Sequence, residues 1–288
     1  MSRVELMSAR DLERMRVSCK LAADTLVMVG KEIRPGLTTD EINTLVHDYT
    51  LEKDAQPSPL NYGGGPDRPA FPKSVCTSVN EVVCHGIPGK HVLKDGDIVN
   101  VDVTSLYPTQ NGFHGDTSAT FYIGEPSEEA RKVVEVARRS LELGIAAVRH
   151  GARLHDIGAA IQEYAEGEGC SVVRDYVGHG IGRVFHAPPQ VPHTGERGTG
   201  KRLKAGMVFT IEPMINLGDY RCRTLDDHWT VKTADGRLSA QFEHTICVTR
   251  EGVEVLTARD QPLRSSEDVP WAQLGELSCA AALEAQQG

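Results

Sequence analysis

Four acidic side chains and one histidine stand where the sequence suits metal chemistry. Asp102 and Glu212 each end a segment with the same pattern, Lys-x-Gly, an apolar run and then an acid. Asp116 and Glu243 add a second acid to each half of the chain, and His179 lies within Gly-His-Gly-Ile-Gly. Four carboxylates and one imidazole form an oxygen-rich donor set, which suits manganese, iron, cobalt or zinc better than a metal that selects thiolates.

Four negative charges can converge in a protein only when cations neutralise them. Two divalent ions that share bridging carboxylates would do so, and a bridging water of lowered pKa would then be a nucleophile at neutral pH. The alternative is that each acid lies in solvent at the mouth of a strand, which is the usual place of a single acid that ends an apolar run. The repetition of the pattern favours the metal site.

Most histidines have a simpler interpretation, because an isolated histidine is usually hydrogen-bonded or on the surface. We interpret the following four in that way: His47, His91, His150 and His193. His179 differs, since its small neighbours would let a backbone turn approach a metal or a substrate closely. His186 follows seven residues later and can share the same face.

The acids belong to a longer internal duplication. A His-Gly-Ile triplet precedes each copy, at 85–87 and at 179–181, and the upstream segments 33–36 and 148–151 also correspond. Several matches in the same order indicate a repeat where one alone would not. We therefore expect two half-sites that meet at one centre.

The composition is that of an ordinary globular protein. Of the 288 residues, 40% are hydrophobic and 25% are charged, and 31 basic against 40 acidic residues give a net charge of −9, which does not indicate a nucleic-acid-binding surface. No apolar run is long enough for a membrane span, and the N-terminus lacks the apolar core of a signal peptide, so we expect a cytoplasmic protein. The 7 irregularly spaced cysteines suggest reduced thiols rather than a disulfide framework or a zinc knuckle.

Hydrophobic periodicity predicts alternating helix pairs and strands. Helices are expected at 8–30 (beginning near Ser8), 39–51 (capped by Thr39), 128–149 (capped by Ser127) and 156–168. Strands are expected around 75 and at 98–103, 120–123, 171–174, 207–211, 229–233 and 244–248. A long proline-rich loop is expected at 57–72, and the tail 263–288 is expected to be partly disordered or a terminal helix.

At these residues the chain resembles the type I methionine aminopeptidases. The resemblance covers about residues 8–257, and five motifs carry it: Ser74-Val75-Cys76, Asn80 to Pro88, His114 to Thr117, Thr210 to Pro213 and Glu243 to Thr245. It implies an α/β (α+β) pita-bread fold, with two pseudo-twofold-related halves and a central antiparallel sheet covered by two helix pairs. We expect one catalytic domain at 1–262, with pseudo-repeats at about 8–124 and 127–250, followed by the tail.

The resemblance also implies roles for single residues. The family's metal ligands, which would hold two divalent ions per chain, match Asp102, Asp116, His179, Glu212 and Glu243, the set already reached from charge. Its active-site histidines match His85 and His186, which would bind the substrate backbone and stabilise charge on the scissile carbonyl and the leaving amine. Glu212 would also carry the proton from the metal-activated water.

The implied reaction removes an initiator methionine when the second residue is small. The methionine pocket of the family matches Cys76, Phe185 and Trp229, and Phe71 stands where a pocket tyrosine often occurs. The segment between the first two acids is a few residues longer than in typical bacterial members, which predicts an extended hairpin loop. A monovalent cation site is expected near Asn80, Val82 and Ser239.

Two alternative functions remain open. The first is a proline-directed peptidase, as in prolidases and aminopeptidase P, although those relatives usually carry a further N-terminal domain. The second is a metal-free binding protein on the same scaffold, which would be expected to have lost ligands. The expected partners are nascent polypeptide N-termini and the ribosome, the latter through the basic cluster from Arg197 to Lys204, with no direct contact to nucleic acid or membrane and with a monomeric state.

Overall fold

A computed structural model describes residues 4–66, 68–261 and 263. Apart from Leu263, the predicted tail lies outside the described residues. The helices are α1 (Ala9–Glu32), α2 (Thr39–Glu52), α3 (Glu128–Ala146) and α4 (Leu154–Gly167). The strands are β1 (Gln56–Pro57), β2 (Cys76–Val79), β3 (Val82–Cys84), β4 (Ile98–Tyr107), β5 (Phe113–Tyr122), β6 (Ser171–Val172), β7 (Gly178–Gly180), β8 (Ala187–Val191), β9 (Val208–Ile211), β10 (Met214–Asn216), β11 (Cys222–Thr224), β12 (Val231–Thr233), β13 (Ser239–Gln241), β14 (Glu243–Val248) and β15 (Val253–Val255).

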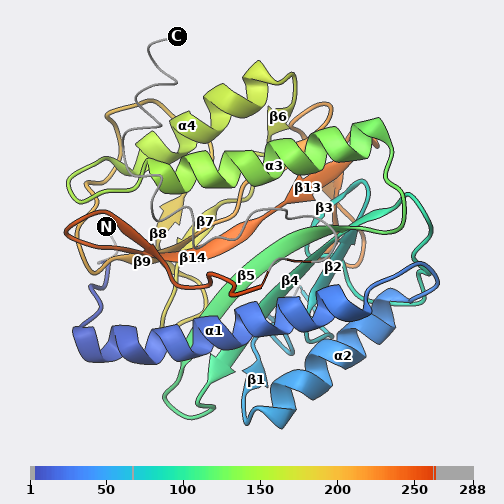
Figure 1. The fold of residues 1–288 in the computed structure, drawn as a ribbon, viewed down its shortest axis with the longest axis horizontal. Helices are drawn as coiled ribbons and strands as arrows, with labels where there is room; N and C mark the ends of the chain where they lie inside the picture. Colours follow the sequence, from blue (N-terminus) through green and yellow to red (C-terminus); the bar gives the residue numbers. More distant parts are fainter. Residues whose placement is uncertain (1–3, 67, 262, 264–288) are drawn as a thin grey trace.

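The centre of the fold is a curled antiparallel sheet. Its strands follow the order β1-β4-β5-β14-β9-β7-β8, with β2 paired to β4 and β15 paired to β14. The strands of the first half and those of the second half therefore meet where β5 pairs with β14. Helix α1 packs on β4 and β5, and α2 packs beside α1 and β1, whereas α3 and α4 lie beside the strands of the second half (Figure 1). The predicted mixed α/β class with a central antiparallel sheet and two helix pairs is confirmed.

The ends of the helices follow from their caps. The Ser8 hydroxyl accepts a hydrogen bond from the Asp11 N–H at 3.2 Å, as expected for the start of α1, but the helix continues past Gly30. The predicted cap of α2 is wrong by one residue, because Thr38 is the cap and its N–H donates to the Glu41 carboxylate at 2.7 Å. A capping box of this kind satisfies two amides that the first turn would otherwise leave unpaired. The third helix begins after Ser127 as predicted and ends at Ala146, before the predicted end.

The two longest strands extend beyond their predictions. Strands β4 and β5 pair continuously from Ile98 with Tyr122 to Tyr107 with Phe113. The extended hairpin loop that was predicted between Asp102 and Asp116 is therefore a short turn at 108–112, and the extra residues lengthen the two strands. The prediction missed the end of β4 and the beginning of β5, because these parts of the two strands are rich in buried polar residues, which interrupt the hydrophobic pattern. Eight short strands have no periodic signal in the sequence and were not predicted: β1, β3, β7, β8, β10, β11, β13 and β15. None of the described helices is long and apolar enough to cross a membrane.

Matched backbone hydrogen bonds support the predicted duplication. The Gly36 N–H donates to the Leu93 carbonyl at 2.8 Å, and the Gly151 N–H donates to the Leu203 carbonyl at 3.0 Å. Both glycines have the same left-handed backbone, with φ of 89° and 90°. The turns before β4 and β9 repeat the match, with the donor and acceptor pairs Gly96 with Ile123 and Gly206 with Val248. We propose that one domain is built from the two predicted repeats.

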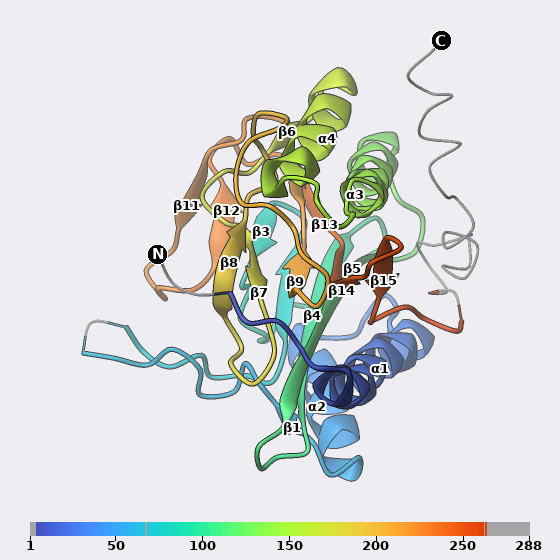
Figure 2. The same cartoon turned by 90° about the vertical axis from the view of Figure 1, so that its left-hand side faces the viewer.

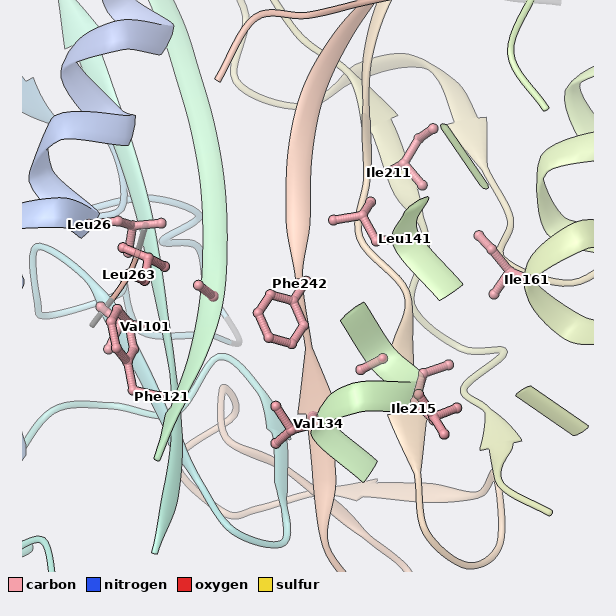
Figure 3. Packing of buried hydrophobic residues seen from close by; sticks show 14 of the residues in the cluster. Leu26, Val101, Phe121, Val134, Leu141, Ile161, Ile211, Ile215, Phe242 and Leu263 are labelled. Carbon is pink, nitrogen blue, oxygen red and sulfur yellow. The ribbon is translucent and has the colours of Figure 1, made fainter. Parts of the chain in front are cut away.

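The hydrophobic core is continuous across both halves. Leu26 and Phe121 lie on the side of the first helix pair, Leu141 and Ile161 lie on the side of the second, and Phe242 lies between them (Figure 3). All five side chains are fully buried. Because a single apolar cluster joins the repeats, neither half has a separate core, and we expect them to unfold together.

Helix α1 approaches β5 closely at one glycine. A Cβ atom at Gly115 would lie 2.4 Å from backbone atoms of Ser18 and Cys19, which is far inside van der Waals contact. Backbone rather than a flexible side chain stands in the way, so the helix would have to move to accept any larger residue. The glycine therefore fixes the distance between α1 and the strand that carries Asp116.

We predict that Gly115→Ala lowers the free energy of unfolding by about 1 to 3 kcal/mol, the usual cost of overpacking a close-packed interior. Urea unfolding would measure the loss. Gly252→Ala is the matched control, since a Cβ at Gly252 meets nothing within 4 Å. Equal stability of the two variants would contradict the proposed close approach.

Candidate metal centre

Five neighbouring strands each bring one predicted ligand to the same region of the sheet. In the order β4, β5, β14, β9 and β7, the strands supply Asp102, Asp116, Glu243, Glu212 (directly after the last residue of β9) and His179. These strands lie side by side in the sheet, with α1 and α3 next to it in Figure 2. Residues that are more than a hundred positions apart in sequence thus become neighbours.

The strand register places the first three acids on one face. Asp102 and Glu243 are both cross-strand partners of Ser118, and Asp116 is the partner of Thr104. Since alternate residues of a strand point to the same face, and direct partners share a face, all five of these side chains project together. Asp102 lies in the middle of β4 rather than at its end, so the strand-mouth alternative does not describe it.

The geometry fits a metal ion. Ligand atoms of Asp116, His179 and Glu243 all lie within 4.8 Å of one another, and all three residues are buried. His179 Nε2 is 3.6 Å from Asp116 Oδ2 and 3.7 Å from Glu212 Oε1. One imidazole nitrogen facing several carboxylate oxygens is a donor set for divalent transition metals. Asp102 stands beside this group on the adjacent strand.

The electrostatics also call for cations. Burial raises the pKa of Asp102 to about 7, and burial, together with the charge of Asp102, raises the pKa of Glu212 to about 8. Burial raises the pKa values of Asp116 and Glu243 well above the usual range, and repulsion from the other acids raises them further. A divalent ion would replace the protons that hold this cluster together, which is the expected behaviour of a metal site.

Two threonines that sequence analysis did not identify orient the ligands. The Thr210 hydroxyl accepts from the His179 N–H at 3.0 Å and donates to Glu212 Oε1 at 2.7 Å. The Thr104 hydroxyl donates to Asp116 Oδ1 at 2.8 Å. Such outer hydrogen bonds fix the direction in which a ligand presents its lone pairs. A threonine in a strand carries no signal for this role in a single sequence.

Glu212 has two further partners. His193, which we predicted to be an ordinary hydrogen-bonded histidine, is buried, and its Nε2 accepts from the Glu212 N–H at 3.1 Å. Burial lowers the pKa of His193 to about 3, so its ring is neutral and can accept this bond. Gln241, which was not predicted, directs its side-chain amide to Glu212 Oε2 at 3.4 Å. The carboxylate of Glu212 is therefore held from several sides.

Of the two predicted active-site histidines, His186 lies against a predicted ligand, and His85 is near enough for the two histidines to interact electrostatically. The ring centroid of His186 is 4.2 Å from that of His179. Burial lowers the pKa of His85 to about 4, and the nearby charges of His186 and Arg68 lower it further. Burial lowers the pKa of His186 to about 3 and that of His179 to about 4. All three rings are neutral at pH 7, so each can donate one N–H or offer one lone pair.

The predicted pocket residues divide into two groups. Phe71, Cys76 and Trp229 form one buried cluster, in which the two aromatic rings meet edge to face at 5.2 Å. Phe185 lies apart from this cluster and packs edge to face on Tyr62 at 5.0 Å. Tyr62 was not predicted, and its ring also contacts that of His186 at 4.9 Å. Its position in the proline-rich loop was the available signal.

Comparisons with known proteins agree with this geometry. Residues 13–250 match the model of metallopeptidase family M24. The chain is 54% identical to methionine aminopeptidase A of Synechocystis sp. over 255 residues, which are 88% of this chain and 97% of that protein. It is 53% identical to the methionine aminopeptidase of Salmonella typhimurium, over 89% of this chain and 94% of that protein.

Solved structures separate two levels of similarity. The methionine aminopeptidase of Rickettsia prowazekii matches with a TM-score of 0.84 at 48% identity, over 88% of this chain and all of that one. The prolidase of Pyrococcus horikoshii matches with a TM-score of 0.70 at 19% identity, over 90% of this chain and 65% of that one. The second match shows a shared fold alone.

The raised carboxyl pKa values predict how the metal-free protein responds to pH. Unfolded carboxyls release their protons near pH 4, whereas Asp102 and Glu212 keep theirs to about 7 and about 8 when folded, so the folded state binds more protons and loses stability as pH rises toward those values. The histidines with lowered pKa values act in the opposite direction, but only below about 6.5, where the unfolded chain takes up protons. Between about pH 6.5 and 8 the carboxyls dominate the pH dependence of stability. We expect the free energy of unfolding to fall by about 1 kcal/mol per pH unit for each carboxyl that is still protonated.

Urea unfolding of metal-stripped protein at about pH 6.5 and at about pH 8 would measure this loss of stability. Glu212→Gln should reduce the slope, because it removes one of the retained protons, and added manganese should reverse the loss. A stability that rises with pH across this window would contradict the assignment.

Proposed function

Given that the chain belongs to metallopeptidase family M24, and within it to the methionine aminopeptidases, we propose that it removes the initiator methionine from polypeptides whose second residue is small. The observation that carries this proposal is the arrangement of five candidate ligands on five adjacent strands beside a buried apolar cluster. Ligand atoms of Asp116, His179 and Glu243 lie within 4.8 Å of one another. The group of candidate ligands suits metal-dependent hydrolysis, and the buried apolar cluster suits a methionine side chain.

The metal site would be dinuclear. Asp102, Asp116, His179, Glu212 and Glu243 would hold two divalent ions, with manganese, iron, cobalt and zinc as candidates. When bound, such ions lower the pKa of water and polarise a peptide carbonyl, which supplies a nucleophile at neutral pH. The separation of His179 Nε2 from Asp116 and Glu212 oxygens, 3.6 and 3.7 Å, leaves room for an ion between these ligands.

Neutral imidazoles would stabilise the transition state. His85 and His186 have pKa values lowered to about 4 and about 3, so at pH 7 each offers an N–H without adding a positive charge near the metals. Directed at the scissile carbonyl oxygen and at the substrate backbone, these donors would bind the charge that develops during attack. Their rings are fixed by aromatic contacts, His85 with Tyr176 at 5.6 Å and His186 with Phe185 at 4.1 Å.

Glu212 would move the proton. One carboxylate oxygen is held by the Thr210 hydroxyl at 2.7 Å, and the backbone N–H is held by His193, so the group cannot turn away from the site. A carboxylate in this position can accept a proton from the attacking water and deliver it to the nitrogen of the leaving amine.

The apolar cluster would select methionine. Phe71, Cys76 and Trp229 form a soft, buried surface, and thioether sulfur packs favourably against aromatic rings. Phe185 would close the pocket from the side of Tyr62. A bulky second residue would have to fit between the two imidazoles and the buried carboxylates, where rigid walls exclude it.

A monovalent cation near Asn80, Val82 and Ser239 is also proposed. The Ser239 hydroxyl is buried and has no hydrogen-bond partner among the described residues. The Ser239 N–H donates to the Asn80 carbonyl at 2.9 Å, which keeps these two residues adjacent. An oxygen that is buried and unpartnered is suited to a hard cation.

We place the reaction in the cytoplasm, on nascent chains, and propose that the monomeric enzyme docks at the ribosome through the loop from Arg197 to Lys204. Arg197 is paired with Glu163 on α4, whereas Lys201 and Arg202 are exposed and available to an acidic protein surface of the ribosome. Co-sedimentation with ribosomes should weaken with salt and with the double change Lys201→Glu and Arg202→Glu. Failure to co-sediment at any salt concentration would count against docking.

Peptide cleavage by metal-stripped enzyme refilled with manganese or cobalt tests the main proposal. We expect release of methionine from Met-Ala-Ser and not from Met-Leu-Ser, because of the walls around the second residue. Asp116→Asn should lower kcat/KM by on the order of 100-fold or more, since even changes to the partners of metal ligands cost 10- to 100-fold. Asp226→Asn, at an exposed position, is the matched control. A folded enzyme that releases no methionine with any metal would favour the metal-free binding protein instead.

A further inference from the structure

A hairpin-like loop projects from the molecule near the candidate site. The Asn61 N–H donates to the Phe71 carbonyl at 2.8 Å, and the Phe71 N–H donates to the Tyr62 carbonyl at 2.9 Å. Farther out, the Gly65 N–H donates to the Arg68 carbonyl at 2.9 Å. The segment stands out from the body of the fold in Figure 2. Its two sides therefore pair and return the chain to the apolar cluster that contains Phe71.

The loop is anchored on Trp229. The indole Nε1–H donates to the Pro69 carbonyl at 2.9 Å. The Arg68 guanidinium carbon lies 3.3 Å from the centre of the indole ring, a close cation–π contact. A Cβ at Gly63 would lie 2.9 Å from the indole edge, so the backbone itself approaches the ring. These contacts hold the guanidinium at a defined place although Arg68 is exposed.

Arg68 forms one wall of a cavity of about 370 Å³, whose other walls are His85, Tyr176, Thr224, His228 and Trp229. Among the described residues, no carboxylate lines this cavity and Arg68 forms no ion pair. The charge of Arg68 reaches the site, since it contributes to lowering the pKa of His85. The cavity thus presents an unneutralised guanidinium whose N–H donors are available to an anion.

His85 and Trp229 belong both to this cavity and to the proposed catalytic site. If the methionine side chain occupies the cluster of Phe71, Cys76 and Trp229, the polypeptide beyond the second residue must leave past His85 toward solvent. An extended chain advances about 3.3 to 3.6 Å per residue, so its third and fourth residues would pass the cavity. A guanidinium held on an aromatic ring is preorganised for a carboxylate there.

We propose that Arg68 determines specificity for substrates with an acidic side chain at the third or fourth residue, an inference that rests on the proposed function. The protein as a whole carries a net charge of −9, so an acidic substrate would otherwise be repelled. Arg68 makes the local charge positive at the place where the polypeptide leaves the candidate site. The preference acts in binding of the substrate rather than in the hydrolytic step.

The experiment compares amidated peptides, which carry no C-terminal charge. Met-Ala-Glu-Gln-amide and Met-Ala-Gln-Glu-amide are compared with neutral Met-Ala-Gln-Gln-amide, each with manganese-loaded enzyme. We expect kcat/KM to be about three- to tenfold higher for at least one acidic peptide, chiefly through KM, and this ratio to shrink in high salt. In Arg68→Gln the ratio should fall to about 1, and Arg68→Lys should restore part of it. Arg131→Gln, which removes the same charge from an exposed site on α3, should keep the ratio of the unmodified enzyme.

The outcomes separate the two proposals. If the unmodified enzyme cleaves the neutral peptide but shows no acidic preference, or if the preference persists in Arg68→Gln, the role of Arg68 is overturned and the aminopeptidase activity stands. If the neutral peptide is not cleaved, the proposed function itself fails. A loss of cleavage of all three peptides by the same factor in Arg68→Gln would show that the residue only supports Trp229, which also overturns the specificity role.

Discussion

The crowding of four carboxylates, two buried and two half-buried, is the constraint on which the rest of this structure depends. Burial raises the pKa of all four acids, and repulsion from neighbouring acids raises the pKa of Asp116, Glu212 and Glu243 further, so the apo site binds protons where the holo site would bind metal. Such a cluster can be assembled only by a scaffold rigid enough to resist its separation. The curled sheet is that scaffold, since each ligand is carried by its own strand and the strands are joined by backbone hydrogen bonds.

The rigidity around the site comes from residues that hold the candidate ligands in place and have no proposed contact with substrate. Thr210 links His179 to Glu212, and His193 holds the backbone of Glu212 from behind. Behind the sheet, a single apolar core that passes through Phe242 ties both helix pairs to the strands. The close contact at Gly115 sets the distance between α1 and the strand of Asp116. Packing and hydrogen bonding thus oppose the electrostatic cost at the centre.

The side of the site that would bind substrate differs from the metal centre, because loops that pack on a few aromatic rings form it. Trp229 contacts Phe71 on one side of this arrangement and receives Arg68 and Pro69 from the projecting loop. Loops tolerate changes in length at little energetic cost, which makes them the natural place for differences in specificity among enzymes that share one metal site. Metal chemistry and substrate choice are therefore separated in the fold, the first on strands and the second on loops.

The sequence by itself determined all four helices and the five candidate ligands, and its motifs carried the family resemblance that implied the fold class. The helices could be predicted because helical periodicity and caps such as Ser8 and Ser127 are local signals that survive in a single chain. The repeated Lys-x-Gly pattern, which marks Asp102 and Glu212, is a local signal of the same kind. Tertiary structure alone decided which residues accompany the ligands. Thr210, Gln241 and Arg68 gain their roles only from strand register and loop closure, because the partners they meet are distant in sequence or are brought to their face by the pairing of strands. Short strands such as β7 were missed for the same reason: three residues have no periodicity of their own, and only hydrogen bonds from neighbouring strands make them part of a sheet.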